Sequence, residues 1–237
     1  MIETAFQRRE FPDGEKLAPA LADWTATRLS AAIAARGAAL LVVSGGQTPR
    51  RFFEALSNVA LDWTRVAITL ADERRVADDS PRSNARLVRE ALLRNHAEAA
   101  SFSPLADARL SEDQELAAAS ACVANLPLPA DVVGLGMGED GHTASWFPGA
   151  EGLAEAMDSG ARTLVAPIRA AGAGEPRLTL TGRVILRASA IALQIEGPAK
   201  LATLAAALGP GPEEDMPIRA VLRRAADRLT VFSATRS

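Results

Sequence analysis

The chain has 237 residues, of which 48% are hydrophobic, 23% are charged and 4% are aromatic. This composition is typical of a folded globular protein, and the length suits one α/β domain over residues 1–237. Lys and Arg (26) against Asp and Glu (29) give a net charge of -3, which excludes a general cationic surface for nucleic acid or an anionic membrane. Any anion must therefore bind in a local pocket.

The cysteine and histidine content limits the possible metal sites. The single cysteine, Cys122, excludes an internal disulfide and a multi-cysteine metal site, and two histidines make a histidine cluster nearly impossible. Met1–Glu10 lacks the apolar core of an export signal, and the longest uncharged stretch, Leu116–Ala130, contains two prolines. We therefore expect a cytoplasmic protein without a metal or a membrane span, as a monomer or a weak homodimer.

Short apolar runs alternate with helical segments along the chain, a pattern typical of a largely parallel sheet with helices on both faces. Ala39–Ser44 is apolar up to its last residue and predicts a strand covered on both sides, followed by a helix from near Pro49. Val66–Leu70 predicts the next strand, followed by an acidic loop at Asp72–Asp79 and a helix capped by Ser83.

The second half of the chain repeats this alternation. Ser111 and Gln114 have the spacing of a capping box and predict a helix to about Asn125. Glu151–Pro176 is rich in Ala and Gly and predicts a loop or lid with one strand at Thr163–Pro167. The remaining predicted elements are strands at Asp131–Leu135, Ala190–Ile195 and Leu229–Phe232, and a helix from about Pro198.

Ligands of open α/β sheets bind beyond the carboxyl ends of the strands, so the loops after the strands are the candidate sites. Ser44–Pro49, here called the cradle loop, reads SGGQTP and joins a buried strand to a helix. Gly45 and Gly46 allow backbone N–H groups to approach a ligand, and Ser44 and Thr48 offer hydroxyls, as an anion site requires. A Walker motif is absent, and a plain strand-to-helix turn is an equal interpretation of this loop alone.

Four consecutive charges, Asp72 to Arg75, follow the second strand. Arg74 or Arg75 could neutralise a phosphate, and the acidic pair could orient an arginine or bind hydroxyls. Taken alone, the segment favours a solvated turn over these roles.

Gly134–Ser145, here called the histidine loop, reads GLGMGEDGHTAS. Gly136, Gly138 and Gly141 formally match the dinucleotide fingerprint GxGxxG, but the flanking acidic residues and Pro148 argue against that interpretation. We instead expect the glycines to present His142 as an acid–base group, with Asp140 orienting its ring. A histidine that caps a following short helix is the alternative.

Three further cations are candidate ligands. Lys200 lies in the first turn of a predicted helix, where the helix dipole disfavours a cation unless an anion is bound nearby. Arg169 and Arg177 bracket the glycine-rich stretch and could reach a ligand. Each of the three could equally be solvated.

SGGQTP, DERRV with Ser83-Asn84, GLGMGEDGHTASWFPG and GPAK together resemble the 6-phosphogluconolactonase family, in order along most of the chain. The DGHTAS segment is specific, whereas SGGxTP is shared with glucosamine-6-phosphate deaminases. The resemblance implies a Rossmann-like α/β fold, no cofactor, and hydrolysis of 6-phospho-D-glucono-1,5-lactone to 6-phospho-D-gluconate in the pentose phosphate pathway.

The resemblance also implies roles for individual residues. His142 would be the general base, beside Asp140, and loop N–H groups around Gly138 to Gly141 or a nearby arginine would stabilise the oxyanion. The family's SPKPPP segment is absent here, which leaves open whether Arg169 or Arg177 completes the site. The implied substrate and phosphate ligands are Ser44, Gly45, Gly46, Thr48, Asp72, Arg74, Gly138, Lys200 and one or both of these arginines.

Two alternatives belong to different functional classes. In an aldose–ketose isomerising deaminase, Asp72 would shuttle the proton. A non-catalytic sugar-phosphate sensor would keep the cradle loop and lack turnover. A Ser-His-Asp hydrolase is a poor competitor, because GxSxG is absent.

Overall fold

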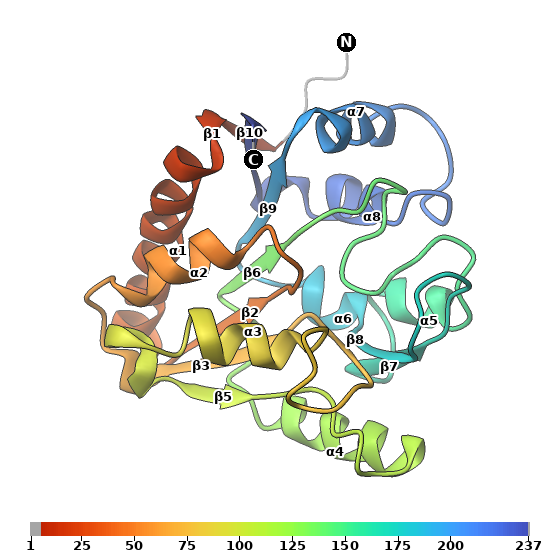
Figure 1. The fold of residues 1–237 in the computed structure, drawn as a ribbon, viewed down its shortest axis with the longest axis horizontal. Coiled ribbons are helices and arrows are strands. Elements are labelled where there is room, and N and C mark those ends of the chain that lie inside the picture. The colour runs from red at the N-terminus through yellow and green to blue at the C-terminus, as the bar shows by residue number, and fades with distance from the viewer. Residues whose placement is uncertain (1–5, 237) are drawn as a thin grey trace.

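The computed structural model describes residues 6–236. The prediction of no export signal depends partly on Met1–Ala5, which lie outside the described residues. Its central feature is a seven-stranded, fully parallel sheet with the order β1-β10-β9-β6-β2-β3-β5 (Figure 1). The strands are β1 (Gln7–Asp13), β2 (Ala39–Val43), β3 (Val66–Leu70), β5 (Ser101–Ser103), β6 (Val132–Leu135), β9 (Ile191–Glu196) and β10 (Leu229–Arg236).

Burial explains why the central strands were visible in the sequence. All five residues of β2 are buried, as a continuous apolar run in a parallel sheet requires, and all six of β9 are buried although two of them are Gln194 and Glu196. The edge strand β1 is mostly exposed, and its charged sequence QRREFPD gave no apolar signal. The α/β class with a mostly parallel sheet is confirmed.

A second sheet was not predicted. It is antiparallel, with the order β4-β8-β7, and its strands are β4 (Asp72–Arg74), β8 (Arg177–Leu180) and β7 (Val165–Ile168). The predicted acidic loop therefore begins as a strand. Glu151–Pro176, predicted as a loop with one strand at Thr163–Pro167, contains β7 and also the helix α5 (Leu153–Met157).

The other helices follow the strands. Ser83 caps α3 by accepting the N–H of Arg86, and both halves of the Ser111–Gln114 capping box are present at α4, as predicted. The long helix α1 was not predicted. The helices are α1 (Gly14–Arg36), α2 (Arg50–Ser57), α3 (Asn84–Ala91), α4 (Glu112–Ala124), α6 (Gly182–Ile185), α7 (Pro198–Ala207) and α8 (Ile218–Arg224).

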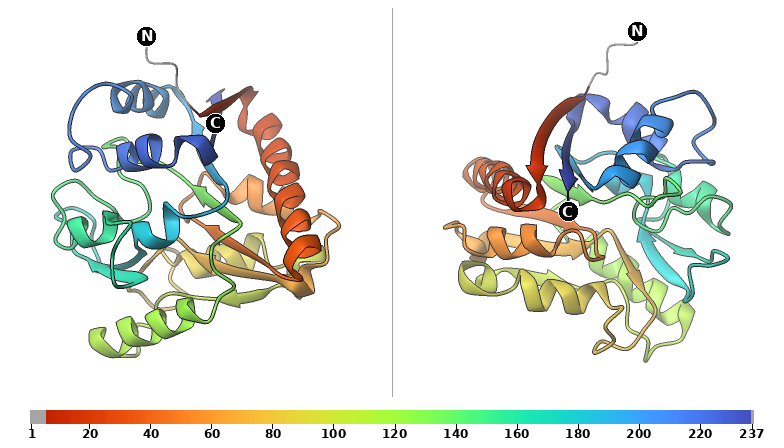
Figure 2. Two further views of the ribbon diagram at one scale, coloured as in Figure 1. Left: turned by 180° about the vertical axis from the view of Figure 1, so that it is seen from behind. Right: turned by 45° about the horizontal axis from the view of Figure 1, so that its top comes forward.

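The direction of the connections reverses in the middle of the sheet. Connections after β1, β2 and β3 run toward the β5 edge, and those after β5, β6 and β9 run back toward the β1 edge. Parallel crossovers are right-handed in nearly all proteins, so the two sets of helices cover opposite faces. Figure 2 shows α1, α2 and α3 together on one side of the sheet, with the later helices on the other. The reversal falls between the adjacent strands β2 and β6.

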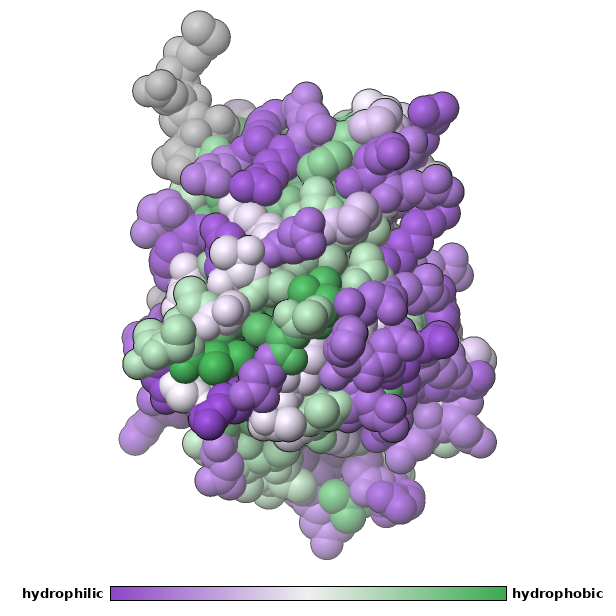
Figure 3. Space-filling model, turned by 90° about the vertical axis from the view of Figure 1, so that its left-hand side faces the viewer, coloured by the Kyte–Doolittle hydropathy of each residue, from purple (hydrophilic) through white to green (hydrophobic). Residues whose placement is uncertain are grey.

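The apolar side chains form one cluster of buried residues that extends from Phe6 to Ala234. Leu208, at 37% exposure, is the large hydrophobic side chain left exposed among residues 6–236. The face in Figure 3 carries mostly hydrophilic residues, with apolar residues in a band across its middle. Within the same described part of the chain, no helix combines the length and apolar character needed to cross a bilayer.

Candidate active site

The switch between β2 and β6 brings two of the predicted loops together. Val43 pairs with Gly134 at the ends of these strands, and the N–H of Ser44 donates to the carbonyl of Gly134 at 3.0 Å. The cradle loop continues β2 and the histidine loop continues β6, so both leave the same edge of the sheet. They line one pocket of about 240 Å³, at the position where open α/β sheets bind ligands.

The cradle loop needs both of its glycines. A Cβ atom on Gly45 would lie 1.8 Å from Oδ1 of Asn84, so the loop backbone packs directly against the start of α3. Gly46 has φ +91°, a backbone conformation that favours glycine. Within residues 6–236, the N–H groups of Gly45 to Thr48 donate to no protein acceptor, and Oγ of Ser44 is buried without a partner. The loop thus offers a row of free donors to an anion.

Two side chains from β9 and α7 hold the end of the cradle loop. Nε2 of Gln194 lies 3.3 Å from the carbonyl oxygen of Thr48, and Nζ of Lys200 lies 3.3 Å from Oγ1 of Thr48. Both side chains line the pocket. Lys200 is therefore placed beside the cradle loop, as predicted for a phosphate ligand, whereas Gln194 gave no signal in the sequence.

The acidic pair after β3 is buried, which makes the solvated-turn interpretation wrong. Asp72 is 5% exposed and Glu73 is 2% exposed. Glu73 accepts the N–H groups of Asn84 (2.9 Å) and Ala85 (2.7 Å) at the start of α3. Burial raises the pKa of the Glu73 carboxyl, and these hydrogen bonds oppose the rise. Glu73 thus anchors the helix that supports the cradle loop.

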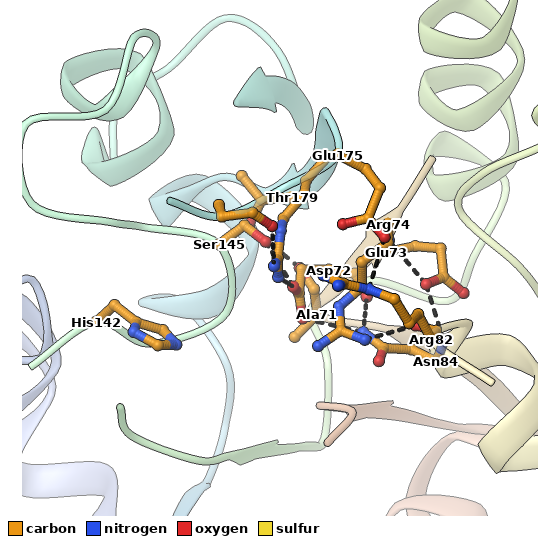
Figure 4. A network of polar contacts seen from close by, with 12 residues as sticks. Ala71, Asp72, Glu73, Arg74, Arg82, Asn84, His142, Ser145, Glu175 and Thr179 are labelled. Atoms are coloured by element: carbon orange, nitrogen blue, oxygen red, sulfur yellow. Dashed lines mark hydrogen bonds and ion pairs between the residues drawn. The ribbon is translucent and has the colours of Figure 1, made fainter. Parts of the chain in front are cut away.

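Asp72 lies at the centre of a polar network (Figure 4). Its Oδ2 accepts the hydroxyl of Ser145 at 2.5 Å and lies 3.7 Å from Nη1 of Arg177. Nδ2 of Asn84 donates to the backbone carbonyl of Asp72 at 2.8 Å. The carboxylate therefore ties the second sheet to the histidine loop.

Arg74 extends from β4 to the pocket. Its Nη1 donates to the carbonyl of Arg82 at 2.5 Å, and its Nε is buried with no hydrogen-bond partner among the described residues. It lines the pocket together with Gly46 and Thr48 of the cradle loop. This placement agrees with the predicted role as an anion ligand.

The histidine loop presents an oriented imidazole. Nδ1 of His142 lies 2.5 Å from Oδ1 of Asp140. A Cβ atom on Gly138 would lie 2.1 Å from the ring, so glycine is needed where the imidazole packs on the backbone. The first helix after His142 is α5, which begins at Leu153, so the helix-capping and dinucleotide interpretations are both wrong. In Figure 4 the ring extends into the space between its loop and the Asp72 network.

An aromatic ring links His142 to an arginine. The His142 and Phe147 ring centroids are 4.3 Å apart, and Cζ of Arg177 lies 4.9 Å from the Phe147 centroid. The His142 side chain is 30% exposed and lines the pocket with Arg177. Phe147 lies in the WFPG end of the GLGMGEDGHTASWFPG segment. Its contact with His142, however, could be seen only in the structure.

The two candidate arginines occupy different places. The Arg177 side chain is 9% exposed, and its Nε is buried with no partner in the part of the chain that the structure describes. Burial lowers the pKa of Arg177, which the carboxylate of Asp72 opposes. Arg169 is exposed, with Nη2 2.5 Å from Oε2 of Glu112, and does not line the pocket. The structure therefore brings Arg177 and not Arg169 to the other candidates.

The predicted amide donors of the histidine loop are partly occupied. The N–H of Gly138 donates to the carbonyl of His142 at 2.9 Å, and the N–H of Gly141 donates to the carbonyl of Gly138 at 3.1 Å. These two groups shape the turn and are not free for an oxyanion. The other predicted donor, an arginine, is present in the pocket as Arg74 and Arg177.

The fold and the pocket define a class: a doubly wound α/β protein with an anion cradle and an oriented imidazole at the topological switch. Residues 12–231 match the family model described as glucosamine-6-phosphate isomerases/6-phosphogluconolactonase. The chain belongs to this family.

Individual relatives point to one branch of the family. A 6-phosphogluconolactonase of Mesorhizobium japonicum is 51% identical over 94% of this chain and 93% of its own length. A 6-phosphogluconolactonase of Pseudomonas aeruginosa is 47% identical over 86% of this chain and 85% of its own. The crystal structure of a 6-phosphogluconolactonase from Shewanella baltica is 40% identical, with a TM-score of 0.93, and the match covers 97% and 98% of the two chains.

Proposed function

We propose that this chain hydrolyses 6-phospho-D-glucono-1,5-lactone to 6-phospho-D-gluconate, the lactone-opening step of the pentose phosphate pathway, with His142 as general base. One observation carries the proposal. The imidazole held by Asp140 lines the same pocket as the free donors of the cradle loop and Lys200. Relatives named 6-phosphogluconolactonase, up to 51% identical, support the same activity.

The phosphate of the substrate belongs at the cradle loop. The N–H groups of Gly45 to Thr48 and the hydroxyl of Ser44 are donors without protein partners among residues 6–236. Lys200 and Arg74 add positive charge to the same part of the pocket. Binding the phosphate at this end orients the distant lactone for attack by water. Such orientation contributes strongly to catalysis.

The tautomer of His142 follows from its hydrogen bond with Asp140. An ionised carboxylate only accepts hydrogen bonds, so Nδ1 carries the proton that is shared with Asp140. The lone pair of Nε2 is then free. We assign Nε2 as the atom that removes a proton from the attacking water.

The reaction proceeds in two steps. Water attacks C1 of the lactone while its proton moves to Nε2 of His142, and the carbonyl oxygen becomes an oxyanion. The intermediate then expels the ring oxygen, which takes the proton back from Nε2. The lactone and one water thus give the open-chain acid, and the imidazole is returned in its starting state.

Arg177 is the donor that we assign to the oxyanion. It approaches His142 across Phe147, and its Nε has no hydrogen-bond partner among residues 6–236. A donor fixed in a partly dry pocket stabilises developing negative charge strongly. Asp72, which also lines the pocket, then orients Arg177 through the 3.7 Å ion pair.

The assay follows acid release from freshly prepared 6-phosphogluconolactone, with correction for spontaneous hydrolysis. Wild type should show turnover, and His142→Ala should lower kcat by ~10²–10⁴-fold with KM little changed. His96→Ala is the matched control, because His96 lies in the exposed 3₁₀ turn after α3. Near-normal turnover of His142→Ala would remove the histidine from its proposed role.

The same samples separate the competing functions. Ammonia release from glucosamine 6-phosphate would establish a deaminase, in which Asp72 shuttles the proton. Tight binding of 6-phosphogluconate without any turnover would establish a sensor. The cytoplasmic location, the single domain, the lack of nucleic-acid binding and the monomeric or weakly dimeric state stay predictions from the sequence.

A further inference from the structure

Helix α7 contacts both loops of the pocket. Near its start, Nζ of Lys200 lies 3.3 Å from Oγ1 of Thr48 in the cradle loop. One turn later, the half-buried hydroxyl of Thr203 lies 3.1 Å from the backbone carbonyl of Glu139 in the histidine loop and 3.1 Å from that of Ala199 in α7, so the two carbonyls share its one proton. Residues three apart share one face of a helix, separated by about 4.5 Å along its axis. A single rigid turn therefore spans the two ends of the proposed substrate site.

A second route fixes the same helix to the histidine loop. Arg219 is buried and donates from Nε to the carbonyl of Ala207 (3.2 Å) and from Nη2 to that of Ala206 (3.3 Å), at the end of α7. The neighbouring N–H of Ile218 donates to the carbonyl of Gly141 at 2.9 Å. The histidine loop is thus held on both sides of Asp140, and both restraints lead to α7.

Packing reinforces the second restraint. A Cβ atom on Gly141 would lie 2.8 Å from Cβ of Met216, so the turn that precedes His142 lies directly against the segment before α8. Gly141 has φ +80°, which adds a conformational reason for glycine there. The turn therefore cannot move closer to the segment before α8.

We propose that the turn of α7 from Lys200 to Thr203 is a spacer that fixes His142 relative to the phosphate cradle, with Thr203 as a positioning residue. Thr203 neither lines the pocket nor belongs to the acid–base pair. It acts through the carbonyl of Glu139, next to Asp140. The inference rests on the proposed function, because a fixed separation matters only for a substrate that is held at one end and attacked at the other.

Loss of the spacer should affect phosphorylated and unphosphorylated lactones differently. A phosphorylated lactone is anchored at the cradle loop, so displacement of the histidine loop misaligns its ester with His142. A misplacement of about 1 Å can cost ~10²-fold in rate. Unphosphorylated glucono-1,5-lactone lacks the anchor and can follow the displaced loop. Loss of the Thr203 contact should therefore reduce turnover of the anchored substrate selectively.

The test compares Thr203→Val with wild type on 6-phosphogluconolactone and on glucono-1,5-lactone. We expect kcat for the phosphorylated lactone to fall about 10-fold with KM little changed, and kcat for the unphosphorylated lactone to change less than about 2-fold. Thr203→Ser keeps the hydroxyl and should restore the rate. Thr203→Ala also removes the hydroxyl, but alanine is not β-branched. It replaces the valine variant if that variant fails to fold.

Thr27→Val is the matched control. Thr27 lies in α1, and its hydroxyl bonds the carbonyl of Asp23 four residues earlier, as Thr203 also does with Ala199. The control should match wild type on both lactones. Equal losses on the two lactones, or no loss with Thr203→Val, would overturn the spacer. Absence of turnover by wild type would instead overturn the proposed function, so the two failures are distinguishable.

Discussion

Nδ1 of His142 lies 2.5 Å from Oδ1 of Asp140, and the same oxygen accepts the backbone N–H of His142 at 3.0 Å. One carboxylate thus fixes both the ring and the backbone that carries it. An amide in place of the carboxylate could donate to Nδ1 and move the ring proton to Nε2. The identity of the group at position 140 should therefore decide whether His142 can act as a base.

Asp140→Asn should reduce turnover of the phosphorylated lactone more than Asp140→Ala does. The asparagine favours the tautomer with a protonated Nε2, whereas the alanine leaves the tautomer unconstrained. We expect at least about a 10-fold loss of kcat for the asparagine variant. Initial rates at saturating substrate measure the difference, and equal rates for the two variants would contradict the tautomer argument.

Lys200→Ala should weaken binding of the phosphorylated lactone and leave the unphosphorylated lactone nearly unaffected. A charge-assisted hydrogen bond contributes about 1.5–3 kcal/mol, so KM should rise by about 10- to 10²-fold. The chain's other lysine, Lys16, is the control, because it is exposed and also occupies the third position of a helix. Equal losses on both lactones would show that Lys200 does not contact the phosphate.

Gly45→Ala should destabilise the fold and displace the cradle loop. The new Cβ would overlap the Asn84 side chain, which is 2% exposed and held by the carbonyl of Asp72. Overpacking of this kind typically costs about 1–3 kcal/mol of the free energy of unfolding. Urea denaturation measures the loss. In an Asn84→Ala background the same change should cost less, and an unchanged cost would place the strain elsewhere.

Glu73 should make stability depend on pH in a defined direction. Burial raises its pKa in the folded state above the ordinary value of 4.5, so the folded protein binds the proton more tightly than the unfolded chain. This contribution to stability is present below pH 4.5 and is lost as the pH rises through the raised pKa. Between these limits the free energy of unfolding of wild type should fall with rising pH relative to Glu73→Gln.

Urea midpoints from pH 4 to 7 measure this difference. Glu98→Gln, at an exposed position, is the control and should keep the wild-type slope. A wild-type slope in the Glu73→Gln variant would mean that the buried carboxyl does not titrate in this interval.

Local sequence patterns predicted five of the seven strands of the central sheet, all but β1 and β5, and the three segments that line the pocket. Buried parallel strands such as β2 need apolar residues at every position, and the caps Ser83 and Ser111 act on neighbours within three residues. The cradle loop and His142 were visible because glycines next to polar groups at strand ends mark ligand loops. All of these signals are local in the chain.

Contacts between side chains that are distant in the sequence could be seen only in the folded structure. β4 and β8 are short strands that pair Asp72 with Thr179. Strands this short, with charged residues among them, show no alternating hydrophobic pattern that would predict their pairing. The choice of Arg177 over Arg169 followed from that second sheet. The contacts of Phe147 with Arg177 and of Thr203 with Glu139 likewise join segments that are far apart in the chain, which local sequence patterns do not encode.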